Sequence, residues 1–167
     1  QQGRYRASYM PPHGSPVKTY LNGIQKKVRE RDGVLLAQIK KGGKLVPPPY
    51  DPLSMGLGAS PKPDKWYIGN CWVYFWFPLI TYETLCPKMH PCPWCKECKT
   101  ESKGLHWRPM FEWMRTVWVL HQRFQCKNPR CPGGIDEEGK KSTSFASIDP
   151  RALSQLPTEV AERYEFM

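Results

Sequence analysis

Between Ser15 and Gly33, apolar residues recur at intervals of three and four positions, as they do on one side of a helix. This hydrophobic stripe consists of Val17, Tyr20, Leu21, Ile24 and Val28. Ser15 can cap the first turn, and Pro16 is well suited to that turn. Gly33 can adopt the left-handed conformation in which many helices end. The pattern therefore predicts an amphipathic helix over about residues 16–32.

The next segments carry apolar patterns of other kinds. Residues 34–46, VLLAQIKKGGKLV, fit either a strand pair that turns at Gly42 and Gly43 or a second short helix, and periodicity alone leaves both open. Residues 66–83 contain the apolar run CWVYFWFPLI, which predicts extended and buried structure.

Large side chains alternate in residues 104–126, which predicts a β-hairpin with its bend near the sequence MRTV. The alternating residues are Trp107, Phe111 and Trp113 on one arm and Trp118, Leu120, Gln122 and Phe124 on the other. Residues 142–148, STSFASI, predict a third strand. After it, Asp149 and Thr158 can each begin a short helix.

Composition adds that the chain is basic, with 25 Lys and Arg against 15 Asp and Glu and a net charge of +10. Residues 1–50 contain ten basic side chains against two acidic ones, and residues 96–131 contain eight against three. Such a surplus favours a polyanionic partner, most often nucleic acid, although the plainer interpretation is that these side chains only solvate the surface. No apolar run reaches the ~18 residues that a membrane span needs.

Four of the seven cysteines form two closely spaced pairs. Cys92 and Cys95 enclose Pro-Trp, and after thirty intervening residues Cys126 and Cys131 enclose Lys-Asn-Pro-Arg. Two such pairs around an insert of hairpin length are the signature of a zinc ribbon, because each tight turn can direct two sulfurs at one ion. Four thiolates leave no open coordination position, so the spacing predicts a structural Zn²⁺.

Other interpretations of the cysteine-rich stretch are weaker. Cys86, His90 and Cys98 could form a second metal site. Three cysteines at equal spacing are similar to an iron–sulfur motif, but the fourth cysteine of that motif is missing. A disulfide knot suits secreted chains, whereas this chain has an odd number of cysteines and no visible secretion signal. The sequence PCPWC matches half of a zinc deaminase motif without its upstream glutamate, so we expect no catalysis.

These patterns predict an α+β fold with two parts. Residues 66–167 would form a small zinc-ribbon-like antiparallel β core with short flanking helices. Residues 1–65 would form a long, partly irregular basic N-terminal arm, which contains the amphipathic helix at about 16–32 and a linker rich in Pro and Gly.

Several stretches are characteristic beyond their composition: WVYFWFP, CPWC, KGLHWRPM, WVLHQRFQC and SFASIDPRALSQLP. Through them, residues 66–167 resemble an uncharacterised cysteine-cluster domain of large eukaryotic proteins, often of transposon origin or linked to transposase, nuclease or helicase modules. The resemblance implies zinc held by Cys92, Cys95, Cys126 and Cys131, and a context of DNA handling without a particular reaction. The usual second pair of that domain is C-x2-C, whereas four residues separate the second pair here.

Taken together, these features predict a non-catalytic, zinc-stabilised module that binds nucleic acid, with DNA favoured over RNA by the transposon-like context. It would be the targeting part of a larger transposon-related or chromatin-associated protein, located inside the cell and in the nucleus. The alternative is a protein-interaction or scaffold module that docks a partner or an adjacent catalytic domain. We expect nucleic acid to contact Lys26, Lys27, Arg29, Arg31, Lys40, Lys41, Lys96, Lys99, Lys103, Trp107, Arg108, Arg115, Arg123, Lys127 and Arg130.

Overall fold

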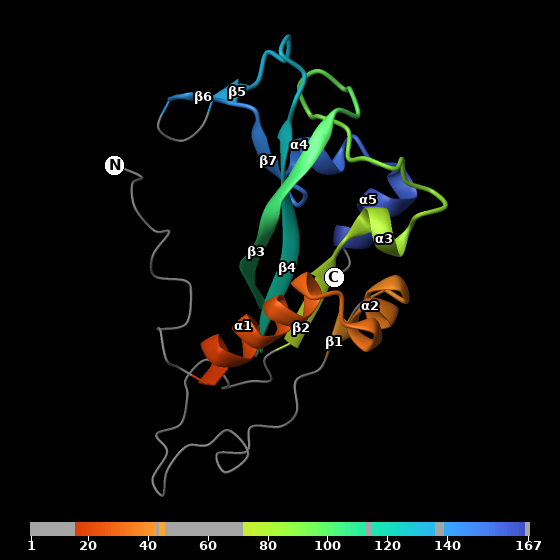
Figure 1. The fold of residues 1–167 in the computed structure, drawn as a ribbon, viewed down its shortest axis with the longest axis vertical. Helices are drawn as coiled ribbons and strands as arrows, with labels where there is room; N and C mark the ends of the chain where they lie inside the picture. Colours follow the sequence, from red (N-terminus) through yellow and green to blue (C-terminus); the bar gives the residue numbers. More distant parts are fainter. Residues whose placement is uncertain (1–15, 43, 46–71, 113–114, 136–138, 166–167) are drawn as a thin grey trace, which may run out of the picture.

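The computed structural model describes residues 16–42, 44–45, 72–112, 115–135 and 139–165, which form a mixed β-sheet with helices packed on both faces (Figure 1). The strands of this sheet are β1 (Lys44–Leu45), β2 (Trp72–Trp76), β3 (Thr100–Glu112), β4 (Arg115–Cys126) and β7 (Ser144–Ala146). A second, small sheet pairs β5 (Gly134–Ile135) with β6 (Lys141–Ser142). The helices are α1 (Pro16–Arg29), α2 (Gly33–Lys40), α3 (Pro78–Thr81), α4 (Pro150–Leu153) and α5 (Thr158–Glu165). The predicted α+β class is confirmed.

Strand β4 lies between β2 and β3 in the sheet order β1-β2-β4-β3, and it also pairs with β7. The predicted hairpin is confirmed as the antiparallel pair β3–β4, whose register runs from Thr100 opposite Cys126 to Glu112 opposite Arg115. The predicted third strand is confirmed as β7, antiparallel to β4. Strand β2, however, runs parallel to β4. The expectation of a purely antiparallel core is therefore wrong, because the chain reverses direction twice after β2 and inserts β4 beside it.

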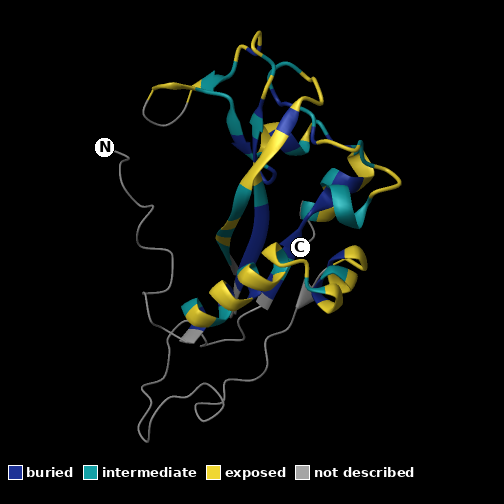
Figure 2. Cartoon of the chain, in the orientation of Figure 1, coloured by how far each residue is buried: buried dark blue, intermediate teal, exposed yellow. Residues whose placement is uncertain are grey.

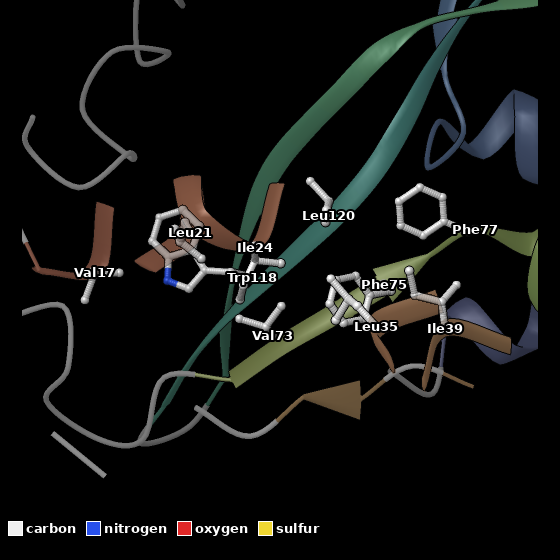
Figure 3. Packing of buried hydrophobic residues seen from close by; sticks show 10 residues of the cluster. All are labelled: Val17, Leu21, Ile24, Leu35, Ile39, Val73, Phe75, Phe77, Trp118 and Leu120. Carbon is white, nitrogen blue, oxygen red and sulfur yellow. The ribbon is translucent and has the colours of Figure 1, made fainter. Parts of the chain in front are cut away.

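The two faces of the sheet carry separate hydrophobic cores, because successive side chains of β2 and β4 point to opposite sides. The first core lies under α1 and α2 (Figure 3) and contains Val17, Leu21, Ile24, Leu35, Ile39, Val73, Phe75, Phe77, Trp118 and Leu120. The second core lies on the other face and contains Trp76, Val117, Val119, Ile148, Leu156 and Val160. The sheet is thus covered on both sides along β4.

The end of α1 differs from the prediction. The helix ends at Arg29, and Arg31 takes the left-handed conformation, with φ 57°. The expectation that Gly33 closes this helix is wrong, because Gly33 begins α2. The carboxylate of Asp32 accepts a hydrogen bond from the amide of Leu35 at 2.9 Å, so it caps the new helix.

Two segments with ambiguous or extended patterns contain helices. Residues 34–46 form most of α2 and then β1, so the helix is the correct alternative for the larger part of that segment. Within residues 66–83, β2 is extended and buried as predicted, but α3 follows it, because Pro78 favours the first turn of a helix. The short helices expected after β7 are confirmed. Asp149 caps α4 by accepting a backbone hydrogen bond at 2.9 Å, and α5 begins at Thr158.

The predicted boundary at residues 65 and 66 lies outside the described residues. The bend predicted near MRTV, residues 114–117, is misplaced, because Arg115, Thr116 and Val117 already belong to β4 and pair with β3. On either side of the boundary, the described chain contributes to one core, since Leu21 of α1 and Trp118 of β4 belong to the same cluster. Within the described residues, no helix combines the length and the apolar character that crossing a membrane requires.

We predict that Leu21→Ala lowers the free energy of unfolding by about 2–5 kcal/mol, because this side chain is fully buried between α1 and the sheet. Val34 of α2 is 75% exposed, so Val34→Ala should change the same quantity by less than about 0.5 kcal/mol. Urea unfolding followed by tryptophan fluorescence measures both values. Equal stability of the two variants would show that α1 is not docked on the sheet.

Candidate metal centre

Four cysteine sulfurs meet at one end of the β3–β4 hairpin, the upper end in Figure 1. Cys92 and Cys95 lie in the loop before β3, Cys126 is the last residue of β4, and Cys131 lies in the loop that follows. All four Sγ atoms lie within 4.8 Å of one another. The hairpin register explains this proximity, because Thr100 at the start of β3 is paired with Cys126.

The distances between the sulfurs fit a tetrahedral ion. Cys92 Sγ lies 3.6 Å from Cys131 Sγ, and Cys95 Sγ lies 3.6 Å from Cys126 Sγ. Metal–sulfur bonds of about 2.3 Å at the tetrahedral angle place neighbouring sulfurs about 3.8 Å apart. A disulfide needs about 2.05 Å, and all the described cysteines are free thiols. The arrangement is therefore that of a metal site and not of two disulfides.

Backbone hydrogen bonds close the turn that carries the first pair. The amide of Lys96 donates to the carbonyl of Cys92 at 2.9 Å, and the amide of Cys92 donates to the carbonyl of Glu97 at 3.0 Å. Lys96 adopts φ 64°, a left-handed conformation that costs about 1–2 kcal/mol in a residue other than glycine. The tightness of this turn directs Cys92 and Cys95 to the same point.

Asn128 holds the turn of the second pair. Its backbone carbonyl accepts a hydrogen bond from the amide of Cys131 at 3.0 Å, and its Oδ1 accepts one from the amide of Arg130 at 3.0 Å. The amide of Lys127 donates to the carbonyl of Lys99 at 2.7 Å, which ties this turn to the loop before β3. Four residues between the cysteines are therefore compatible with two converging sulfurs.

The thiols differ in how readily they lose their protons. Burial raises the pKa of Cys92, and it raises the pKa of Cys126 to about 12. Burial also acts to raise the pKa of Cys95, but hydrogen bonds from the Glu97 amide, from the Asn128 side chain and from the neighbouring thiols lower it to about 7. Cys95 therefore loses its proton more readily than Cys92 and Cys126 do. A cation among the sulfurs would favour the thiolate form of the others.

This donor set fits a structural ion. Four thiolates complete a tetrahedral coordination shell and leave no position for water or a substrate. Three of the four cysteines are buried and Cys95 is half-buried, so the bonds to the ion would be largely shielded from solvent. Such an ion would hold the two loops together at the end of the hairpin and would supply no chemistry of its own.

Trp94, between the first two cysteines, extends this centre into a small core. Its ring packs edge-on against Phe145, with the ring centroids 5.8 Å apart. The ring also lies against Gly134 in β5, where a Cβ atom would be 2.6 Å from the Trp94 ring. Glycine is thus needed at position 134 because the indole ring occupies the place of a side chain.

The second metal site considered for Cys86, His90 and Cys98 does not form in the described residues, where the four cysteines above are the one group close enough to hold an ion. Cys98 is exposed, and Cys86 packs against the second hydrophobic core. His90 is fully buried, with ring centroids 5.2 Å from Phe124 and 5.4 Å from Phe145. Burial lowers the pKa of His90, which therefore packs as a neutral ring.

The predicted nucleic-acid contacts fall into three regions. Those on α1, on α2 and at their ends are all exposed, and they are Lys26, Lys27, Arg29, Arg31, Lys40 and Lys41. Those around the cysteines are also exposed, and they are Lys96, Lys99, Lys103, Lys127 and Arg130. The hairpin carries exposed Arg108 and Arg123, Arg115 at the start of β4, and Trp107, which is partly buried and packs against the first core.

Much of the positive charge around the cysteines is paired with carboxylates. Lys99 Nζ lies 3.0 Å from Glu97, and Glu101 lies 2.7 Å from Lys103 Nζ and 2.6 Å from Lys127 Nζ. Hydrogen bonds from Lys103 and Lys127, reinforced by their charges, lower the pKa of Glu101. The count of basic residues in this region therefore overstates the charge that is available to a partner.

Comparison with protein-family models, with curated proteins and with solved structures finds no match to this chain. The resemblance to a transposon-associated cysteine-cluster domain therefore stays a prediction. Function has to be argued from the four-cysteine centre and from the distribution of charge.

We predict that the purified protein carries about one metal ion per chain and that Cys126→Ser carries almost none, because three remaining thiolates leave the coordination shell open. At a free metal concentration 1,000 times the dissociation constant, loss of binding removes about 4 kcal/mol of stabilisation. Elemental analysis and thermal unfolding measure the two effects. Cys98→Ser is the matched control, since this cysteine is exposed in the loop before β3 and should be dispensable. Equal metal contents would contradict the assignment.

We also predict that Gly134→Ala destabilises the metal-bound protein by about 1–3 kcal/mol, because the new Cβ would lie 2.6 Å from the ring of Trp94. Gly23→Ala introduces the same methyl group in α1, where nothing lies within 4 Å among the described residues. This control should be stabilised by about 0.5–1 kcal/mol. Chemical unfolding measures both, and a stabilised Gly134→Ala protein would show that the indole ring does not pack on β5.

Proposed function

We propose that this chain is a non-catalytic, zinc-stabilised module that binds nucleic acid, and DNA in preference to RNA. The proposal rests on one observation: the fold exposes a surplus of positive charge, and a closed four-thiol site can stabilise that fold. A site without an open position serves the fold. The charge is then the feature that defines the partner, and nucleic acid is the commonest polyanion.

Zinc is the ion that best suits the four thiols. Zn²⁺ favours tetrahedral thiolate coordination and undergoes no redox change, which matches a structural role. The two cysteine turns flank the β3–β4 hairpin, as the two turns of a zinc ribbon flank theirs. The spacing of the cysteines and their convergence at one point both support this proposal.

The helices α1 and α2 supply one basic surface. Their apolar sides face the sheet, while their outer sides are exposed (Figure 2). In the part of the chain that the structure describes, Lys26 lies 3.8 Å from the carboxylate of Glu30, whereas no ion pair is formed by Lys27, Arg29, Arg31, Lys40 and Lys41. Cations without carboxylate partners are the ones that can engage phosphates at no cost in lost ion pairs.

Docking of a protein partner is the second candidate for the charged surface. The large hydrophobic residues that are exposed in the described part of the chain are Val34, Leu85, Met89 and Ile135. They lie on α2, on the loop after α3 and on β5, and so do not favour one apolar docking patch. The nuclear, transposon-related or chromatin-associated context is part of the proposal and is supported by the family resemblance.

We predict that the protein binds duplex DNA with an affinity that falls steeply as the salt concentration rises. The triple variant Lys27→Gln, Arg29→Gln and Arg31→Gln should bind at least about tenfold more weakly at low salt. The slope of log affinity against log salt should decrease by up to about 3, because each lost phosphate contact removes about 0.9. Fluorescence anisotropy at several salt concentrations measures both quantities.

A matched control removes three exposed cations from other elements, Lys88, Arg151 and Arg163. It should change the slope by less than about 1. Equal losses in the two triple variants would exclude the surface of α1 and α2 as a specific contact. Absence of binding to duplex DNA, single-stranded DNA and RNA would contradict the proposed function.

A further inference from the structure

One face of the β3–β4 hairpin carries basic side chains next to its apolar end. On β4, Val117 and Val119 pack in the second core. Side chains two positions apart on a strand project from the same face, so His121 and Arg123 continue the row that these valines begin. His121 is buried and Arg123 is exposed. The row thus changes from apolar to cationic as it approaches the cysteines.

Strand β3 repeats this change on the same face. Met110 packs against the second core, and Arg108 and His106 follow it at steps of two residues. His106 is paired with His121 in the register, and their rings stack with centroids 6.1 Å apart and an interplanar angle of 28°. The stack shows that the basic rows of the two strands lie side by side.

Arg123 borders an open position on the neighbouring strand. Its register partner is Gly104, which follows a β-bulge at Ser102 and has φ 117°. Among the described residues, nothing lies within 4 Å of the point where a Cβ at position 104 would be. A ligand can therefore approach the guanidinium of Arg123 from across the hairpin.

The charged neighbours that act on the two histidines are all positive. Burial, followed by the charges of Arg123 and Arg29, lowers the pKa of His106. Burial also lowers the pKa of His121 to about 4, with further contributions from His106, Arg108 and Arg123. Within the described residues, no carboxylate forms an ion pair with Arg108 or Arg123. Arg108 and Arg123 are therefore cations without a carboxylate partner, and they flank two histidines that are favoured in the neutral form.

Helix α1 lies on the opposite face of the hairpin, against the first core, but it reaches the edge strand β3. Gln25 Nε2 donates a hydrogen bond to the carbonyl of Leu105 at 2.8 Å, which fixes the helix beside the edge strand β3. Arg29, one turn further along α1, is close enough to influence the charge of His106. Arg29 thus adds positive charge beside the edge of β3, although the helices and the basic group on the hairpin lie on opposite faces of the sheet.

We propose that His106, Arg108 and Arg123 form a phosphate-binding centre and, building on the proposed function, that nucleic acid is held there by its phosphodiester backbone. Like charges gathered without a counter-ion repel one another, and a phosphate relieves that repulsion. Each guanidinium can donate two parallel hydrogen bonds to phosphate oxygens, and the imidazole of His106 can donate one. His121, stacked on His106 and buried, positions that ring.

The lysines around the cysteines are the alternative group that could bind the phosphates of nucleic acid. Lys99, Lys103 and Lys127 already lie 2.6–3.0 Å from Glu97 or Glu101. A phosphate that binds to them has to displace a carboxylate or approach against its negative charge, whereas Arg108 and Arg123 offer free donors. The two groups can be separated by experiment because a double variant of each removes two positive charges.

The experiment compares Arg108→Gln/Arg123→Gln with Lys99→Gln/Lys103→Gln in the metal-loaded protein, after metal content and thermal unfolding confirm that both fold. Anisotropy with duplex DNA at several salt concentrations is the first measurement. The arginine variant should lose at least about tenfold in affinity, and its salt slope should decrease by about 2. The lysine variant should lose less than about threefold, because its charges are already paired.

The second measurement follows the imidazole resonances of His106 during a titration with inorganic phosphate, without DNA. Phosphate should shift these resonances and raise the pKa of His106 in the wild-type protein, because a nearby anion favours the protonated ring. The arginine variant should show neither effect, and the lysine variant should show both. This titration separates recognition of the phosphate group from recognition of a nucleic-acid polymer.

The outcomes distinguish the two proposals. If the protein binds DNA and the two double variants weaken binding equally, the hairpin centre is overturned and the proposed function stands. If the protein binds no nucleic acid, the proposed function fails, and the phosphate titration alone decides on the centre. A phosphate-induced shift of the His106 resonances that is lost in the arginine variant then supports the phosphate-binding centre. The absence of any shift in the wild-type protein overturns it.

Discussion

The structure depends on the position of β4, which pairs with β2, β3 and β7 and whose side chains supply both hydrophobic cores. A long hairpin is only marginally stable by itself, because one face or the other is left in water. Here Trp118 is covered by α1, Val119 is covered by the C-terminal segment, and the last residue, Cys126, belongs to the four-thiol group. Packing fixes the body of the hairpin, and a metal ion would fix its open end.

The features that the sequence predicts well are those in which local spacing determines geometry. The interval between Cys92 and Cys95 allows one tight turn, and the alternation from Trp107 to Phe124 allows one hairpin, so the convergence of the four sulfurs follows from both. Asp149 could be recognised as a cap because its carboxylate binds the next turn of its own helix. The helix α1 is predicted by its apolar stripe. In each case the interacting groups are close in sequence or joined by a single reversal of the chain.

The features that the sequence did not reveal depend on contacts between distant segments or on competition between neighbours. Nothing in the run WVYFW indicates that it pairs in parallel with a strand more than forty residues later. The end of α1 was misplaced because Asp32 caps the next helix more effectively than Gly33 ends the first. The stack of His106 on His121 requires the register of the completed hairpin. Composition also treats every lysine as a free charge, whereas Glu101 pairs with two of them.

A metal ion in the four-thiol centre would also reduce the positive charge that the basic residues near it offer to a partner. A divalent ion with four thiolates would carry a net charge of about −2, so it would add negative charge to that of Glu97 and Glu101. With an ion bound, the lysines at this end of the hairpin would balance a local anionic centre as well as the carboxylates. Arg123 lies three residues before Cys126, about 10 Å along the strand, which is comparable with the screening length of ~8 Å at physiological salt. Arg123 would thus be the first cation before Cys126 along β4 whose charge such a centre leaves largely uncompensated.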